Sequence, residues 1–126
     1  MKQKWFETAR AVAMTGVGTG PRRSFRHGAV LVKKNRVVSV GLNSMKTHPI
    51  LSRFTLWPYM HAESNAIIRH GLDNCEGLGL YVVRIDRNND YMMSRPCRAC
   101  RGLIEQAGLS DTYYTDERGG FHGLHK

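Results

Sequence analysis

The sequence contains no long apolar run. None of its stretches approaches the roughly 20 apolar residues that a helix needs to span a bilayer. The N-terminal segment MKQKWFETARAVAM also lacks an apolar core followed by a small-residue cleavage site. We therefore expect no membrane span and no signal peptide. We predict a cytoplasmic protein with a single domain over residues 1–126.

Cysteine is scarce, because the chain has only three. An odd number, with two cysteines at Cys-x-x-Cys spacing, argues against a disulfide framework and for a reducing compartment. The third, Cys75, is expected to pack as a small apolar residue.

Acidic residues are also few: 10 Asp and Glu stand against 19 Lys and Arg, for a net charge of +9. A surface of this charge attracts polyanions or phosphorylated small molecules. The composition therefore favours a phosphate-bearing partner, either a nucleotide or a nucleic acid.

The spacing of apolar and turn residues predicts a mixed α/β order. Helices are expected over 2–18, 61–71 and 94–108, and strands over Ala29–Val32, Val37–Gly41, 77–86 and 110–117. The order α-β-β-α-β-α-β predicts a mixed central sheet with helices on both faces, in three layers. Residues 44–60 contain two prolines and no clear period, which predicts a long irregular loop.

Two short motifs carry the chemistry of the chain. The stretch PYMHAESNAI places His61 and Glu63 at the start of a helix, and SRPCRAC places Cys97 and Cys100 in the first turn of another. If these helices lie side by side, one His and two Cys converge as zinc ligands and the fourth position stays open, as in catalytic rather than structural zinc sites. Glu63 can then approach a water in that position without binding the metal.

The combination His-Ala-Glu with Pro-Cys-x-x-Cys resembles the signature of the zinc-dependent cytidine and deoxycytidylate deaminase superfamily. The stretches HGAVLVKKNRVVSVGLN, KTHP, LYVVRID and YYTDERG extend the similarity to small deaminase-like proteins of phages and large viruses. The resemblance implies the three-layer cytidine deaminase-like fold, a Zn²⁺ cofactor and a homo-oligomer. It also implies hydrolytic deamination of a cytosine moiety, with a free nucleotide such as dCMP as the leading substrate.

Carried over by position, the resemblance implies that His61, Cys97 and Cys100 bind zinc and that Glu63 shuttles protons. It further implies that Asn43 hydrogen-bonds the base or sugar and that the Ala62 backbone N–H contacts the base. His48, beside a proline in the 44–60 loop, is our candidate pocket residue from that loop. Trp57 and Tyr59 either pack in the core or stack on the base. Arg95 occupies a place where the family commonly has an acidic residue.

Several alternatives stay open at this point. The substrate could be a base in single-stranded DNA or RNA, including adenosine in tRNA, or the chain could be a non-catalytic zinc-stabilised nucleic-acid-binding module. Cys97 and Cys100 with His122 and His125 could also form a structural zinc site, although the spacing departs from that of zinc fingers. We finally predict a phosphate-binding rim around the pocket, composed of Arg22, Arg23, Arg26, Lys46 and Arg53.

Overall fold

The computed structural model describes residues 2–16, 25–43 and 61–124. Its elements in chain order are α1 (Gln3–Met14), β1 (Arg26–Lys33), β2 (Arg36–Leu42), α2 (Ala62–His70), the short 3-10 helix η3 (Leu72–Asn74), β3 (Gly79–Ile85), β4 (Tyr91–Met92), α3 (Arg98–Ala107), β5 (Asp111–Thr115) and β6 (Phe121–Gly123). Residues 44–60, which include His48, Trp57 and Tyr59, lie outside the described residues, as do Arg22, Arg23, Lys46 and Arg53.

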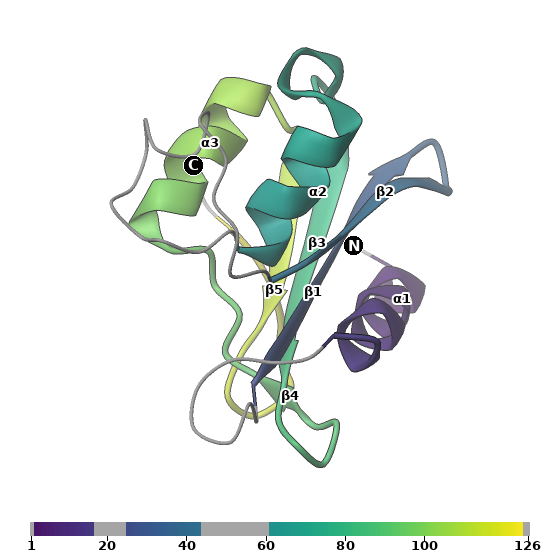
Figure 1. Cartoon of the computed structure of the whole chain (residues 1–126), viewed down its shortest axis with the longest axis vertical. Helices are drawn as coiled ribbons and strands as arrows, with labels where there is room; N and C mark the ends of the chain where they lie inside the picture. Colours follow the sequence, from purple (N-terminus) through teal and green to yellow (C-terminus); the bar gives the residue numbers. More distant parts are fainter. Residues whose placement is uncertain (1, 17–24, 44–60, 125–126) are drawn as a thin grey trace.

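The strands form one mixed sheet in the order β2-β1-β3-β5-β6, with β4 paired to β3. The β3–β5 pair is parallel and the other pairs are antiparallel. Helix α1 covers one face of the sheet, and α2 and α3 lie side by side on the other (Figure 1). The predicted three-layer α/β/α fold is therefore confirmed.

Alternation along the central strands divides the core in two. Ala29 and Leu31 of β1 and Val82 of β3 pack with α2 and α3. Their neighbours Val30 and Val83 pack with α1 instead. Since successive side chains of a strand point to opposite faces, a nearly continuous apolar strand supplies both layers at once.

Two glycines allow the helices to approach the sheet closely. A Cβ added to Gly28 would lie 2.3 Å from the carbonyl oxygen of Ala9 in α1. A Cβ added to Gly41 would lie 2.2 Å from the carbonyl oxygen of Ala62, at the start of α2. Gly41 therefore sets how deeply the N-terminal end of α2 sits on β2.

The structure adds two strands that the sequence did not predict. Strand β4 has only two residues, too few to show alternation, and β6 lies in the glycine-rich segment after β5. In α1, Phe6 is fully buried, whereas its neighbour Trp5 is only partly buried. Phe6 stacks on Phe121 of β6 at a centroid distance of 4.1 Å. This contact with β6 helps to bury the side of α1 that carries Phe6.

Candidate metal centre and active site

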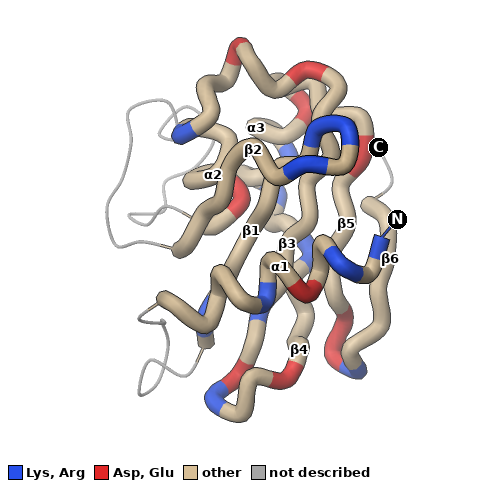
Figure 2. The backbone as a smooth tube through the Cα atoms, turned by 90° about the vertical axis from the view of Figure 1, so that its right-hand side faces the viewer, with Lys and Arg blue, Asp and Glu red and all other residues tan. Residues whose placement is uncertain are grey.

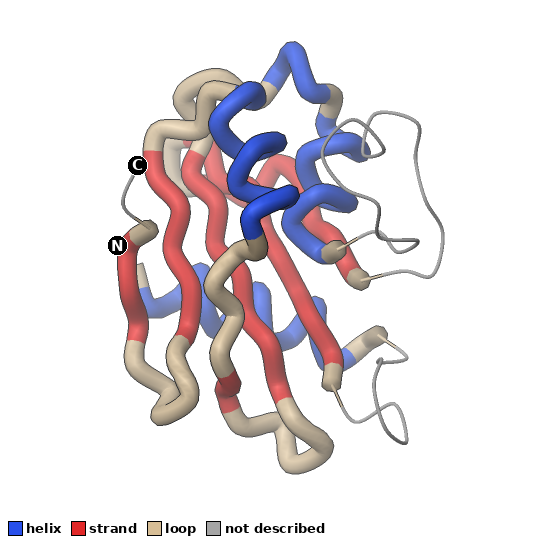
Figure 3. The backbone as a smooth tube through the Cα atoms, turned by 90° about the vertical axis from the view of Figure 1, so that its left-hand side faces the viewer, coloured by secondary structure: helices blue, strands red, loops and turns tan. Residues whose placement is uncertain are grey.

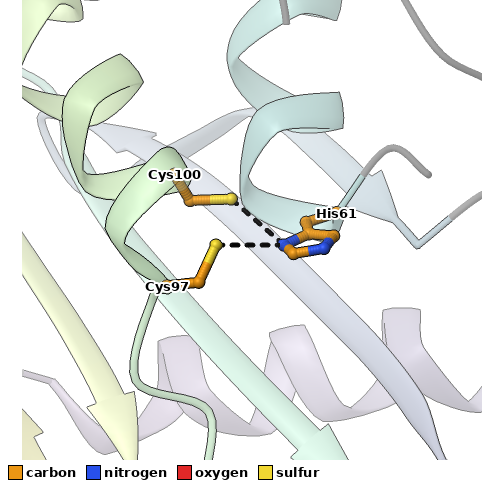
Figure 4. A group of neighbouring side chains, drawn as sticks. All are labelled: His61, Cys97 and Cys100. Carbon is orange, nitrogen blue, oxygen red and sulfur yellow. Dashed lines mark hydrogen bonds between the residues drawn. The ribbon is translucent and has the colours of Figure 1, made fainter. Parts of the chain in front are cut away.

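The N-terminal ends of α2 and α3 meet above the sheet. His61 is the residue immediately before α2, Cys97 is the residue immediately before α3, and Cys100 lies in the first turn of α3. All three side chains point into the space between the two helix ends (Figure 4). The convergence expected from the two motifs is thus present in the structure.

The three ligand atoms lie at distances that suit a tetrahedral metal. His61 Nδ1 is 3.5 Å from Cys97 Sγ and 3.2 Å from Cys100 Sγ. All three atoms lie within 4.8 Å of one another. A zinc ion at its usual bond lengths separates a nitrogen and a sulfur ligand by about 3.5 Å in tetrahedral geometry. The donor set is therefore the right size and chemistry for zinc, with a fourth position left for water or substrate.

The pKa values of the two cysteines are shifted in opposite directions. The pKa of Cys97 is lowered to about 3, chiefly because the Cys100 thiol donates a hydrogen bond to it, with His61 adding to the effect. The same hydrogen bond raises the pKa of Cys100, and burial and the nearby Glu63 carboxylate raise it further. The hydrogen bond to Cys97 likewise raises the pKa of His61. A cation that binds both sulfurs must displace the Cys100 proton, so metal affinity should rise with pH.

Glu63 is buried beside this cluster and is only 4% exposed. Its Oε1 lies 3.3 Å from Cys100 Sγ and 3.7 Å from His61 Nδ1. Burial raises the pKa of the Glu63 carboxyl, which brings its proton exchange closer to neutral pH. A buried carboxyl next to a metal site, but outside the ligand set, has the placement of a general acid–base group.

The predicted substrate contacts lie around the same opening. Asn43 follows β2, and its Oδ1 accepts the backbone N–H of His27 at 3.1 Å, which leaves the Nδ2 group as the donor for a ligand. Ala62 is the first residue of α2, where backbone N–H groups have no partner within the helix. His48 lies outside the described residues.

Two side chains that the sequence left unassigned hold the centre in place. Asn65 Oδ1 accepts the backbone N–H of Leu42 at 3.1 Å and so ties α2 to β2. Ser94 is buried below the segment that leads to Cys97; its Oγ donates to the Val82 carbonyl at 2.8 Å and accepts the Thr115 N–H at 2.7 Å. No motif in the sequence marks Ser94, because its partners lie on two different strands.

The structure does not support the alternative zinc site. His122 lies on β6, and its Nε2 is 2.6 Å from Asp116 Oδ2. His125 lies outside the described residues. Among the residues that the structure does describe, the group able to hold a metal contains His61, Cys97 and Cys100 and excludes His122.

Arg26 does not join a rim around the pocket. Its guanidinium donates to the Asp86 carbonyl at 2.8 Å and to Asn89 Oδ1 at 2.5 Å, and so holds the β3–β4 turn. By strand alternation it shares the face of Gly28, which α1 covers. The prediction for Arg26 is therefore wrong, because the strand register turns it away from the centre.

Comparisons with known proteins agree with this geometry. Residues 1–116 match the model of the cytidine and deoxycytidylate deaminase zinc-binding region. The deoxycytidylate deaminase of Mus musculus is 27% identical over 128 residues, which cover 91% of this chain and 66% of the mouse protein. The chain thus spans just under two thirds of the length of that relative.

Solved structures share the fold. The dCMP deaminase from cyanophage S-TIM5, in complex with dCMP and dUMP, superposes with a TM-score of 0.64 at 22% identity, over 93% of this chain and 85% of that one. The cytidine deaminase from Burkholderia pseudomallei gives a TM-score of 0.67 at 21% identity, over 98% and 91% of the two chains.

Within residues 2–16, 25–43 and 61–124, none of the helices combines the length and apolar character that a membrane crossing requires. The family match covers most of the chain, and its zinc-binding character agrees with the donor set between α2 and α3. The chain therefore belongs to the cytidine and deoxycytidylate deaminase family, a family of zinc-dependent hydrolytic deaminases.

Proposed function

We propose that this protein deaminates the cytosine moiety of a free nucleotide such as dCMP. The observation that carries the proposal is the buried Glu63 carboxyl, 3.7 Å from His61 Nδ1 and outside the group of metal-binding side chains. A purely structural zinc site needs no such group. Burial of an ionisable side chain costs stability, and side chains perturbed in this way cluster at functional sites. The similarity to deoxycytidylate deaminases supports the choice of base.

In this proposal His61, Cys97 and Cys100 hold the zinc ion. Both helix N-termini direct their partial positive charge at the centre, which stabilises the two thiolates. A zinc ion held there lowers the pKa of water towards neutrality and so supplies a nucleophile.

Glu63 moves the protons. Its carboxylate accepts a proton from the attacking water, whose oxygen forms a bond to the amine-bearing carbon of the base. Glu63 passes this proton to the ring nitrogen, then takes a second proton from the newly formed C–O–H group and passes it to the departing amine. The C–N bond breaks, ammonia leaves, and cytosine and water have become uracil and ammonia.

Asn43, Ala62 and His48 are our proposed substrate contacts. The Nδ2 group of Asn43 donates to the base or the sugar, and the Ala62 N–H donates to the base. The position of Asn43 is held by the His27 backbone, so its amide is oriented before a substrate arrives.

In the described part of the chain, the charge distribution favours a small substrate over a polynucleotide. Lys and Arg there are spread over α1, the β1–β2 turn, the β3–β4 turn and α3, with acidic residues between them (Figure 2). A polynucleotide site normally needs a continuous basic stripe along the strand. We further propose a homo-oligomer located in the cytoplasm. Light scattering of the purified zinc-loaded protein tests the oligomeric state.

The test is product analysis by mass spectrometry. Zinc-loaded protein is offered dCMP, deoxycytidine, single-stranded DNA and RNA, including a tRNA, in parallel. We expect conversion of dCMP to dUMP. The Glu63→Gln variant should keep its zinc and lose activity by about 10²–10⁴-fold, whereas Glu105→Gln, an exposed change on α3, should act as wild type.

Each other outcome excludes the proposal in a defined way. Conversion only in DNA or RNA would identify a polynucleotide deaminase. Conversion of adenosine would show that the substrate base is adenine and not cytosine. Absence of any product from zinc-loaded protein would indicate a non-catalytic zinc-binding module.

A further inference from the structure

A row of three residues lies on the sheet just beyond the N-terminal ends of α2 and α3. Strand pairing places His27 of β1 opposite Arg84 of β3, and the His27 N–H bonds Asn43 at the end of β2. His27 has the same strand parity as Ala29, and Arg84 the same as Val82, so both face the layer of α2 and α3. In the described part of the chain, α2 and α3 cover only the upper half of this face (Figure 3).

Arg84 is a cation without a counter-ion in the described residues. Its guanidinium forms no hydrogen bond or ion pair with any of them, and its Nε is buried without a partner. The guanidinium carbon lies 4.0 Å from the centre of the Phe25 ring, a cation–π contact that positions the group. A desolvated donor left unpaired costs stability, so an Arg in this state is poised for an anion.

His27 is the strand partner of Arg84 and stays uncharged near neutral pH. Burial lowers the pKa of His27 to about 4, and the charges of Arg84 and His61 lower it further. The neutral imidazole leaves Arg84 as the fixed positive charge of the row.

Gly41 of β2 lies against Ala62 at the start of α2, and its register row continues through Ala29 to Val82. The next row on the same face holds His27 and Arg84, so Arg84 lies on the sheet close to the start of α2.

The chemistry of the Arg84 guanidinium favours a phosphate group as its ligand. A guanidinium presents donors in a planar fork that matches two oxygens of a phosphate, and it stays charged at all physiological pH values. The cytosine base has one carbonyl oxygen and no negative charge, so it is a weaker partner for Arg84 than a phosphate.

We propose that Arg84 binds a phosphate group of the substrate, so that the site selects phosphorylated nucleotides over nucleosides. This inference rests on the proposed deaminase function. It differs from the rim expected from the sequence, since Arg84 lies on the sheet and belongs to β3.

The first experiment compares dCMP with deoxycytidine. Arg84→Gln should raise KM for dCMP by about 10- to 100-fold, with KM for deoxycytidine and kcat unchanged. Arg84→Lys keeps the charge but loses the fork and should give an intermediate KM. Arg36→Gln, an exposed change at the start of β2, is the matched control and should act as wild type.

An unchanged preference for dCMP over deoxycytidine in Arg84→Gln would overturn the inference. Failure of the proposed function is a different result, because the wild-type protein would then not convert dCMP at all. A larger effect of Arg84→Gln on an oligonucleotide than on dCMP would assign the phosphate to a polynucleotide backbone.

A second experiment uses the wild-type protein and needs no variant to fold. Phenylglyoxal modifies accessible arginines, and mass spectrometry reports modification at each position. Inorganic phosphate and dUMP should slow modification of Arg84, and deoxyuridine should not, while Arg36 should react equally in all samples. Equal modification of Arg84 with and without dUMP and phosphate would refute phosphate binding at this residue.

Discussion

Removing the Ser94 hydroxyl should weaken both the fold and the metal centre. The Ser94 Oγ accepts the Thr115 N–H at 2.7 Å and donates to the Val82 carbonyl at 2.8 Å, and Ser94 is only 8% exposed. In Ser94→Ala the Thr115 N–H stays buried without its partner. We expect the free energy of unfolding to fall by about 2–3 kcal/mol, a large share of the roughly 5–15 kcal/mol typical of a domain.

Urea unfolding of the zinc-loaded protein measures this change. With a slope of about 2 kcal/mol per molar urea, the midpoint should fall by about 1 M or more. Zinc affinity should fall as well, because Ser94 anchors the segment that leads to Cys97. The matched control is Ser110→Ala, an exposed serine before β5, whose effect should stay within about 0.5 kcal/mol. Equal midpoints for the two variants would refute the reasoning that Ser94 anchors this segment.

Three further changes test other parts of the structure. Cys97→Ala should lose zinc in metal analysis and lower the melting temperature; zinc retained at full occupancy would place the ligands elsewhere. Gly41→Ala places a methyl group 2.2 Å from the Ala62 carbonyl, so it should displace α2 and lower both stability and zinc content, whereas Gly79→Ala, whose added carbon meets nothing closer than 4.0 Å, should do neither. The pKa of His27 is lowered to about 4 in the fold from an ordinary value of 6.5, so the unfolded chain binds a proton first as the pH falls. The free energy of unfolding should therefore decrease between pH 6.5 and 4 by up to roughly 3 kcal/mol. In His27→Gln the urea midpoint should change less with pH over this range. The same pH dependence of the midpoint in the variant and the wild type would show that other groups cause the loss.

The metal ligands and the proton-transfer group could be predicted because they are local patterns. His61 with Glu63, and Cys97 with Cys100, are each set by spacing within one helix turn, and helix N-termini suit these groups. The apolar strand over 77–86 was equally clear, because its run of buried side chains needs no partner to be recognised.

Only the tertiary structure determined which side chains the pairing of distant strands brings together. The register of β1 against β3 brings His27 opposite Arg84 and turns Arg26 to the other face. A shift of one residue would exchange these positions, since side chains alternate along a strand. Residue spacing within the chain contains no information on that register. The anchoring of Ser94 and the placement of Arg84 depend on that register. The sequence by itself therefore identified the chemistry of the centre, and the packed sheet determined which other described side chains surround it.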